Sequence, residues 1–307
     1  MIEMNAIQRE HCPLCHEKGR GRLLEKGGGC YVKCSRCGLV YSDPATMPEG
    51  LKEIADEWAA KHHGSEQKLK WEGNAPLQEM VYGPRMWQID QYKYFNRLLE
   101  VGCSTGEFLE YASRHGWQVE GCEIAEHTAQ IARERVGCEI RRSPFEKSGY
   151  EEDCFDVVVM WDVIEHLFDP LAALEEAWRV LRPGGLLALT TPNYDSLTRI
   201  LIGPRWEALI PKHHLFVFDA STIKRLVSVT GGRVVALRAV DLNPFDIISA
   251  MINRKSYGFE DKQKNIEAVK DIMLRRPGLA LARAALNTLL SATRTGDVLE
   301  VYAERAP

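Results

Sequence analysis

One segment, a strand that runs directly into a glycine turn and then into a helix, constrains the fold of this chain most. Residues 98–101 are a largely apolar run typical of a buried strand, and Gly102 and Gly106 follow it. The apolar residues of 108–112 then recur at helical spacing. Glycine lets the backbone bend tightly and approach a bound molecule, and the first N–H groups of the helix face the same place. The segment therefore predicts a ligand-binding turn.

A second strand follows the glycine turn and ends in an acid. Residues 116–122 are the strand, and Glu123 lies about twenty residues after the turn, where a nucleotide-binding sheet places the carboxylate that accepts ribose hydroxyls. Nicotinamide-binding sheets share this layout. These two segments therefore predict a nucleotide site without deciding the class of cofactor.

Motifs later in the sequence distinguish between the classes of cofactor. A fourth strand at 155–162 is followed by Val-Ile-Glu-His-Leu at 163–167, and Leu-Arg-Pro-Gly-Gly at 181–185 marks the turn before a fifth strand. With these motifs in this order, residues 85–304 resemble the class I S-adenosylmethionine-dependent methyltransferases. The resemblance implies an α/β fold, a seven-stranded Rossmann-like doubly wound sheet with a reversed last strand. A helical insertion at 242–296 precedes that last strand.

The resemblance also implies which residues bind the cofactor, S-adenosylmethionine. In that family the glycine loop wraps the methionine part, and the acid that matches Glu123 holds the ribose. Ser104 stands where the commoner family loop has glycine. The implied cofactor-binding residues are Glu100, Gly102, Cys103, Ser104, Thr105, Gly106, Glu123, Ile124, Phe145, Asp162 and Val163.

The predicted catalytic residues are Glu165, His166 and His214. The first two follow the fourth strand at the carboxyl edge of the sheet, where ligands bind in open α/β folds. A histidine titrates near neutrality, so His166 is suited to accept a proton from the acceptor. The alternative is a residue that only shapes the loop, because methyl transfer to some nucleophiles needs little beyond alignment.

A metal-assisted reaction is a sharper hypothesis for the same residues. Some relatives, among them quinone-precursor O-methyltransferases and small-RNA 3′-end methyltransferases, use a Glu-His pair and further ligands to serve a metal-bound hydroxyl. The resemblance thus allows a second divalent metal here, with Asp162, Glu165, His166 and His214 as ligands.

Two Cys-x-x-Cys pairs near the N-terminus have zinc-ribbon spacing. The pairs are Cys12 with Cys15 and Cys34 with Cys37, separated by eighteen residues. Four thiolates complete a tetrahedral shell and leave no open position, so we expect a structural zinc ion. The alternative, two redox dithiols, lacks a thioredoxin-like strand and helix around it.

The motifs divide the chain into four parts. We expect a zinc ribbon at 1–44, a mostly helical linker or cap at 45–96, and a methyltransferase domain formed by 97–241 and 297–307. The insertion at 242–296 has apolar faces that need a partner. They would pack on their own domain, act as a lid over the acceptor, form a homodimer or lie on a membrane surface.

Composition limits the partners. The 307 residues are 45% hydrophobic and 27% charged, which suits one α/β domain with small additions. No apolar run reaches the roughly 18 residues of a membrane span, and a signal-peptide core is lacking, so we expect a cytoplasmic location. A net charge of −4 gives no general attraction to nucleic acid.

We therefore expect methyl transfer to a small-molecule or saccharide acceptor. The alternatives are an RNA methyltransferase that grips its substrate with the ribbon and a catalytically inactive scaffold subunit.

Overall fold

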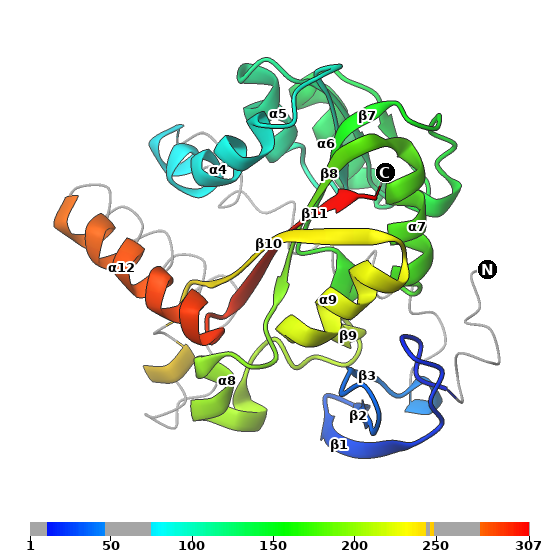
Figure 1. The fold of residues 1–307 in the computed structure, drawn as a ribbon, viewed down its shortest axis with the longest axis vertical. Coiled ribbons are helices and arrows are strands. Elements are labelled where there is room, and N and C mark those ends of the chain that lie inside the picture. The colour runs from blue at the N-terminus through cyan, green and yellow to red at the C-terminus, as the bar shows by residue number, and fades with distance from the viewer. Residues whose placement is uncertain (1–10, 47–74, 244–245, 249–276, 307) are drawn as a thin grey trace.

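The computed structural model describes residues 11–46, 75–243, 246–248 and 277–306 of the chain (Figure 1). The part of the predicted cap at 47–74, and the parts of the predicted insertion at 244–245 and 249–276, lie outside the described residues.

The helices and strands of the described residues have the following bounds. The strands are β1 (Arg20–Lys26), β2 (Gly29–Cys34), β3 (Val40–Ser42), β4 (Arg97–Val101), β5 (Gln118–Cys122), β6 (Ile140–Arg141), β7 (Phe155–Trp161), β8 (Leu181–Pro192), β9 (Phe216–Val217), β10 (Gly232–Val240) and β11 (Val298–Arg305). The α-helices are α4 (Ala75–Asp90), α5 (Glu107–Arg114), α6 (Glu126–Val136), α7 (Pro170–Val180), α8 (Leu197–Ile202), α9 (Ala220–Val229) and α12 (Pro277–Thr293). Short 3₁₀ turns lie at 44–46, 145–147, 164–166 and 203–205.

The predicted seven-stranded sheet is confirmed. Its strand order is β10-β11-β8-β7-β4-β5-β6, with the five strands from β8 to β6 parallel. β11 runs antiparallel to both of its neighbours, as a reversed last strand should. Because parallel strands end at one edge, the carboxyl ends of β4, β5, β7 and β8 lie together there.

Helices cover both faces of this sheet. Apolar residues of α4, α5 and α6 pack on one face in a cluster that includes Leu98 and Val159, and those of α7 and α9 pack on the other with Leu99 and Val158. Successive residues of a strand point to opposite faces of the sheet. Because helices cover both faces, β4 and β7 are apolar almost throughout. Asp219 begins α9 with a capping box.

The Leu-Arg-Pro-Gly-Gly motif differs from its predicted role as a turn before the fifth strand. α7 ends at Val180 and β8 begins at once with Leu181, so residues 182–185 form an irregular part of the strand itself. Leu181 pairs with Phe155 and Leu186 with Val157, so the motif is a bulge opposite β7.

The sheet of the N-terminal ribbon includes a strand from much later in the chain. Its order is β1-β2-β3-β9, and the fourth strand comes from the segment after β8 (Figure 1). Val40 pairs with Val217 and Tyr41 with Phe216. The ribbon therefore shares hydrogen bonds with the part of the chain that carries His214, while a domain boundary at residue 44 stays a prediction.

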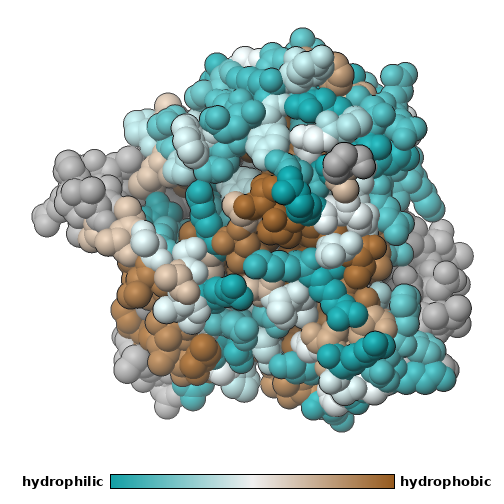
Figure 2. All heavy atoms as spheres, in the orientation of Figure 1, coloured by the Kyte–Doolittle hydropathy of each residue, from teal (hydrophilic) through white to brown (hydrophobic). Residues whose placement is uncertain are grey.

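The described end of the predicted insertion is α12, which lies beside β10 (Figure 1). Arg283 forms an ion pair with Asp241 at 2.8 Å, and Leu290 is buried. The other side of the helix leaves Leu289 exposed, and Figure 2 shows apolar atoms gathered where α8 and α12 lie. A homodimer or lid at this surface stays a prediction. Within the described ranges, no helix combines the length and apolarity that crossing a membrane requires.

Candidate active site and metal centre

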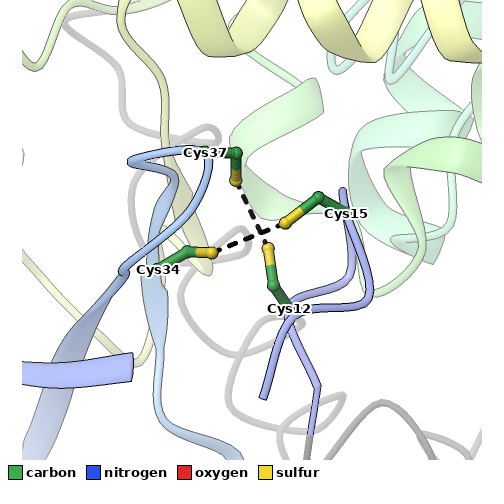
Figure 3. A group of neighbouring side chains, drawn as sticks. All are labelled: Cys12, Cys15, Cys34 and Cys37. Carbon is green, nitrogen blue, oxygen red and sulfur yellow. Dashed lines mark hydrogen bonds between the residues drawn. The ribbon is translucent and has the colours of Figure 1, made fainter. Parts of the chain in front are cut away.

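The four cysteines of the two pairs converge as the sequence predicts. Cys34 ends β2 and Cys37 follows it in a turn, while Cys12 and Cys15 lie in the turn before β1 (Figure 3). The Sγ atoms of Cys12 and Cys37 are 3.5 Å apart, as are those of Cys15 and Cys34. All four ligand atoms lie within 4.8 Å of one another.

This cluster fits a zinc ion. Four sulfurs at about 2.3 Å from a tetrahedral zinc ion lie about 3.8 Å from each other, close to the spacing observed. Cys30 is outside the group, and its Sγ accepts a hydrogen bond from Arg22 Nε at 3.2 Å. The cluster has no position left for a substrate, so zinc would stabilise the ribbon without entering the reaction.

The glycine loop lies between β4 and α5. Gly102 and Gly106 have φ of 67° and 76°, which glycine adopts without strain, and Ser104 also has a positive φ of 47°. The N–H groups of Gly102 and Cys103 both donate to Cys122 O, at 2.8 and 3.2 Å. The loop is thus fixed to the end of β5.

Glu123 lies directly at this loop. Its Oε2 accepts a hydrogen bond from Ser104 N, and its Oε1 accepts one from Ala125 N, both at 2.9 Å. These two bonds fix the carboxylate against the start of the loop and the turn before α6. Ser104 keeps the backbone donor that the commoner glycine would supply, and the serine variant therefore does not disturb this contact.

The other predicted cofactor residues surround the loop at different depths. Glu100, Cys103, Thr105 and Phe145 are buried, and burial raises the pKa of the Cys103 thiol well above its usual range. Ile124 is 42% exposed beside Glu123. Their contacts with cofactor stay predictions.

Val163 connects the glycine loop with the end of β7. A Cβ placed on Gly102 would lie 2.7 Å from Val163 Cγ2, so the loop packs directly on the turn that leads to Glu165. Asp162 precedes this turn with a φ of 54°, and its Oδ1 accepts a hydrogen bond from Thr190 Oγ1 at 2.9 Å. The predicted cofactor loop and the predicted catalytic residues are therefore adjacent.

Glu165 and His166, which are neighbours in one 3₁₀ turn, come together with His214 from a distant segment. Their ligand atoms are within 4.8 Å of one another, and the two imidazole rings meet edge to face with centroids 4.8 Å apart. Asp162, the fourth residue of the metal hypothesis, is not a member of this group. His213 is the immediate neighbour of His214, but its ring is also outside the group.

Hydrogen bonds fix the tautomers of both histidines. His166 Nδ1 lies 2.7 Å from His213 O, and His214 Nδ1 lies 2.7 Å from Ala208 O. A carbonyl oxygen can only accept, so each Nδ1 carries the proton and each Nε2 presents a lone pair. This is the arrangement that metal-binding histidines commonly have.

Burial disfavours the charged forms of all three side chains. It lowers the pKa of His214 to about 3, aided by nearby His166, and it also lowers the pKa of His166. Burial, followed by the charge of Asp162, raises the pKa of Glu165 well above its usual range. Glu165 Oε2 is buried with no hydrogen-bond partner among the described residues. A divalent cation would supply that partner and favour the ionised carboxylate, so the donor set fits such an ion.

The comparisons with known proteins agree with this geometry. A family model described as a methyltransferase domain matches residues 78–237, just over half of the 307 residues. The chain belongs to the methyltransferase domain family. Membership of this family supports S-adenosylmethionine as the cofactor, and the use of this cofactor and the residues that bind it are proposals.

Relatives of this methyltransferase are known in sequence and in structure. A ubiquinone biosynthesis O-methyltransferase of Cereibacter sphaeroides is 35% identical over 117 residues, 36% of this chain and 47% of the relative. The chain thus spans about half the length of the curated relatives it matches. The S-adenosylmethionine-dependent methyltransferases of Thermotoga maritima and Archaeoglobus fulgidus both have a TM-score of 0.50, with 17% and 18% identity. The matches cover 83% and 81% of this chain and 99% and 98% of those structures, and they show a shared fold.

Proposed function

We propose that this methyltransferase transfers the methyl group of S-adenosylmethionine to a hydroxyl oxygen of a small-molecule acceptor. The observation that carries the proposal is the contact between the glycine loop and the turn that holds Glu165 and His166. The similarity to ubiquinone biosynthesis O-methyltransferases supports an oxygen acceptor. Saccharide hydroxyls belong to the same chemical class and are included in the proposal.

The protein would align the acceptor with the cofactor and lower the pKa of the acceptor hydroxyl. The acceptor oxygen attacks the methyl carbon in line, the carbon–sulfur bond breaks, and the positively charged sulfonium leaves as a neutral thioether. Gly102, Ser104 and Glu123 would hold the cofactor, while Glu165, His166 and His214 would bind a divalent metal ion next to it. Such an ion lowers the pKa of a hydroxyl that it binds. The hydroxyl proton leaves to solvent in this scheme, because both imidazoles would serve as ligands of the ion and could not also accept a proton.

Proton acceptance by His166 itself is the rival for the same group. The convergence of two imidazoles with a buried carboxylate favours the metal. A lone general base would need no such convergence.

The contacts of basic side chains in the ribbon argue against the alternative in which the ribbon grips RNA. Arg20 lies 3.4 Å from Asp43, Arg22 lies 3.0 Å from Glu25, and the Lys26 ammonium donates to Trp206 O. These basic side chains are engaged within the protein. The ribbon therefore offers less free positive charge than its sequence indicates.

The test uses two adjacent histidines as a matched pair. Mn²⁺ titrated into zinc-loaded protein should bind to the wild type and to His213→Ala but not to His214→Ala, with equal affinity of all three for S-adenosylmethionine. Turnover with a panel of catechols and saccharides should then require Mn²⁺ or Mg²⁺. Equal Mn²⁺ binding by both variants, or full turnover without a second metal while zinc is retained, would overturn the metal assignment. Absence of S-adenosylmethionine binding by the wild type would overturn methyl transfer.

A further inference from the structure

The segment that carries His213 and His214 is held by the zinc ribbon. We call residues 206–215 the histidine segment. Tyr31 Oη donates to His214 O at 2.7 Å, and Ser42 Oγ donates to Pro211 O at 2.7 Å. The backbone N–H of Ser42 donates to Leu215 O at 2.8 Å. Donors on β2 and β3 thus fix three carbonyls of one short segment.

Close packing accompanies these hydrogen bonds. Tyr31 is completely buried, in a cluster that also contains Val40, Tyr194, Trp206, Leu209 and Val217. A Cβ on Gly29 would lie 2.7 Å from Pro211 Cβ, so the first residue of β2 must be glycine for this approach. The histidine segment therefore cannot move away from the ribbon without losing buried contacts.

The same segment sets the orientation of both histidine rings. His166 Nδ1 donates to His213 O, and His214 Nδ1 donates to Ala208 O. Both acceptors are backbone atoms of the histidine segment. A shift of these carbonyls changes the direction of both Nε2 lone pairs, although neither histidine belongs to the cysteine cluster.

We propose that the zinc ribbon positions the methyl-transfer site, and that Tyr31 is its principal positioning residue. The path runs from the four cysteines, which join the end of β2 to the turn before β1, through the Tyr31 hydroxyl to the His214 carbonyl. The inference rests on the proposed function in placing Glu165, His166 and His214 at the reacting centre. It gives the ribbon a role beyond its own stability.

The neighbouring strand offers a matched control. Tyr31→Phe removes only the hydroxyl that donates to His214 O at 2.7 Å, and leaves the longer contact of this carbonyl with Ser42 Oγ at 3.4 Å. Tyr41→Phe removes a buried hydroxyl from β3 that makes no hydrogen bond to the histidine segment. Both variants keep the aromatic ring, so loss of core packing affects neither.

The first measurement is ¹⁵N–¹H correlation of the imidazole side chains in the full, zinc-loaded chain. The wild type and Tyr41→Phe should show His166 and His214 with protonated Nδ1, with the His214 signals assigned from His214→Ala. Tyr31→Phe should show mixed tautomers for His214. A Tyr31→Phe spectrum identical to wild type would overturn the proposal. If Tyr31→Phe loses zinc, Ser42→Ala takes its place, with the same expected shift and the same refuting result.

The second measurement separates this inference from the proposed function. Tyr31→Phe should bind Mn²⁺ about 10- to 100-fold more weakly than the wild type, the usual effect of disturbing residues that orient metal ligands. Zinc content and S-adenosylmethionine affinity should not change. Wild-type protein that binds no Mn²⁺ would overturn the second metal but leave the tautomer comparison decisive for Tyr31. Equal Mn²⁺ affinities of the wild type and Tyr31→Phe would contradict the positioning role.

Discussion

The carboxylate of Glu123 accepts a hydrogen bond from the backbone N–H of Ser104 at 2.9 Å, so the acid at the end of β5 and the glycine loop form one unit. Glu123→Gln keeps the size of this side chain but removes its charge and replaces an acceptor with a donor. We expect about 10- to 100-fold weaker binding of S-adenosylmethionine by calorimetry, because a hydrogen bond to a charged group contributes about 1.5–3 kcal/mol. Glu126→Gln, at the exposed start of α6, is the control and should bind like the wild type. Unchanged affinity of Glu123→Gln would remove Glu123 from the site.

Two glycines of nearly equal φ differ in what surrounds them. Gly102→Ala places a Cβ 2.7 Å from Val163 Cγ2, while Gly137→Ala, at a φ of 71°, meets nothing within 4 Å. Both changes should lower the free energy of unfolding by about 1 kcal/mol through backbone strain. Only Gly102→Ala should also weaken S-adenosylmethionine binding, by about tenfold or more, because the turn at Val163 must move. Similar cofactor affinities for the two variants would contradict the role of this contact.

The zinc content of the protein should depend on the four converging cysteines and not on Cys30, the fifth cysteine of the ribbon. Cys34→Ser should abolish zinc measured by atomic emission on purified protein, and the free energy gained from metal binding should be lost from the ribbon. Cys30→Ser should retain one zinc ion per chain, since Cys30 lies outside the cluster. Retention of zinc by Cys34→Ser would show that three thiolates suffice.

Asp156 is fully buried at the start of β7 and bonds to Arg182 Nε at 2.6 Å. Its Oδ2 also accepts hydrogen bonds from the N–H groups of Tyr94 and Arg97. Asp156→Asn leaves the guanidinium of Arg182 unpaired, and we expect a loss of about 3 kcal/mol in the free energy of unfolding. Asp153→Asn, a more exposed partner of Arg305, should cost about 1 kcal/mol or less. Chemical denaturation of the wild type and both variants measures these losses in the free energy of unfolding.

The same carboxylate should contribute to acid sensitivity. Burial raises the pKa of Asp156, but Arg182 and the backbone N–H groups outweigh this effect and hold the pKa below its usual value of 3.8. The folded pKa is lower than the unfolded one, so the stabilisation is complete above about pH 4 and is lost as the pH falls through the folded pKa. The difference in unfolding free energy between wild type and Asp156→Asn should shrink over that acidic range. A constant difference down to pH 2 would refute this assignment.

Local signals in the sequence predicted most of the sheet. β4 and β7 are short apolar runs, which sequence patterns identify as buried strands. The cysteine cluster was predictable for the same reason, since two close pairs need only one hairpin to meet. The approach of His214 to Glu165 and His166 was predicted from a family resemblance, and the structure brings these three together without Asp162.

Contacts between segments far apart in the chain could not be predicted from such local signals. β9 has only two residues, too few for any recognisable periodicity, and it pairs with β3 from far earlier in the chain. Tyr31 and His214 are 183 positions apart, and a buried tyrosine in a strand indicates packing before it indicates a hydroxyl with a specific acceptor. The irregular start of β8 was also missed, because proline and two glycines ordinarily indicate a turn.

The pairing of β3 with β9 has a consequence for dissecting this protein into pieces. A fragment cut at residue 78, where the family match begins, would lose β1 to β3 and leave Phe216 and Val217 as an uncovered sheet edge. Trp206 and Leu209, buried against the ribbon, would become exposed beside that edge. Uncovered edges next to apolar surface recruit further chains, so the catalytic half alone would be prone to aggregate. The ribbon therefore also acts as an intramolecular solubility partner for the fold to which it is attached.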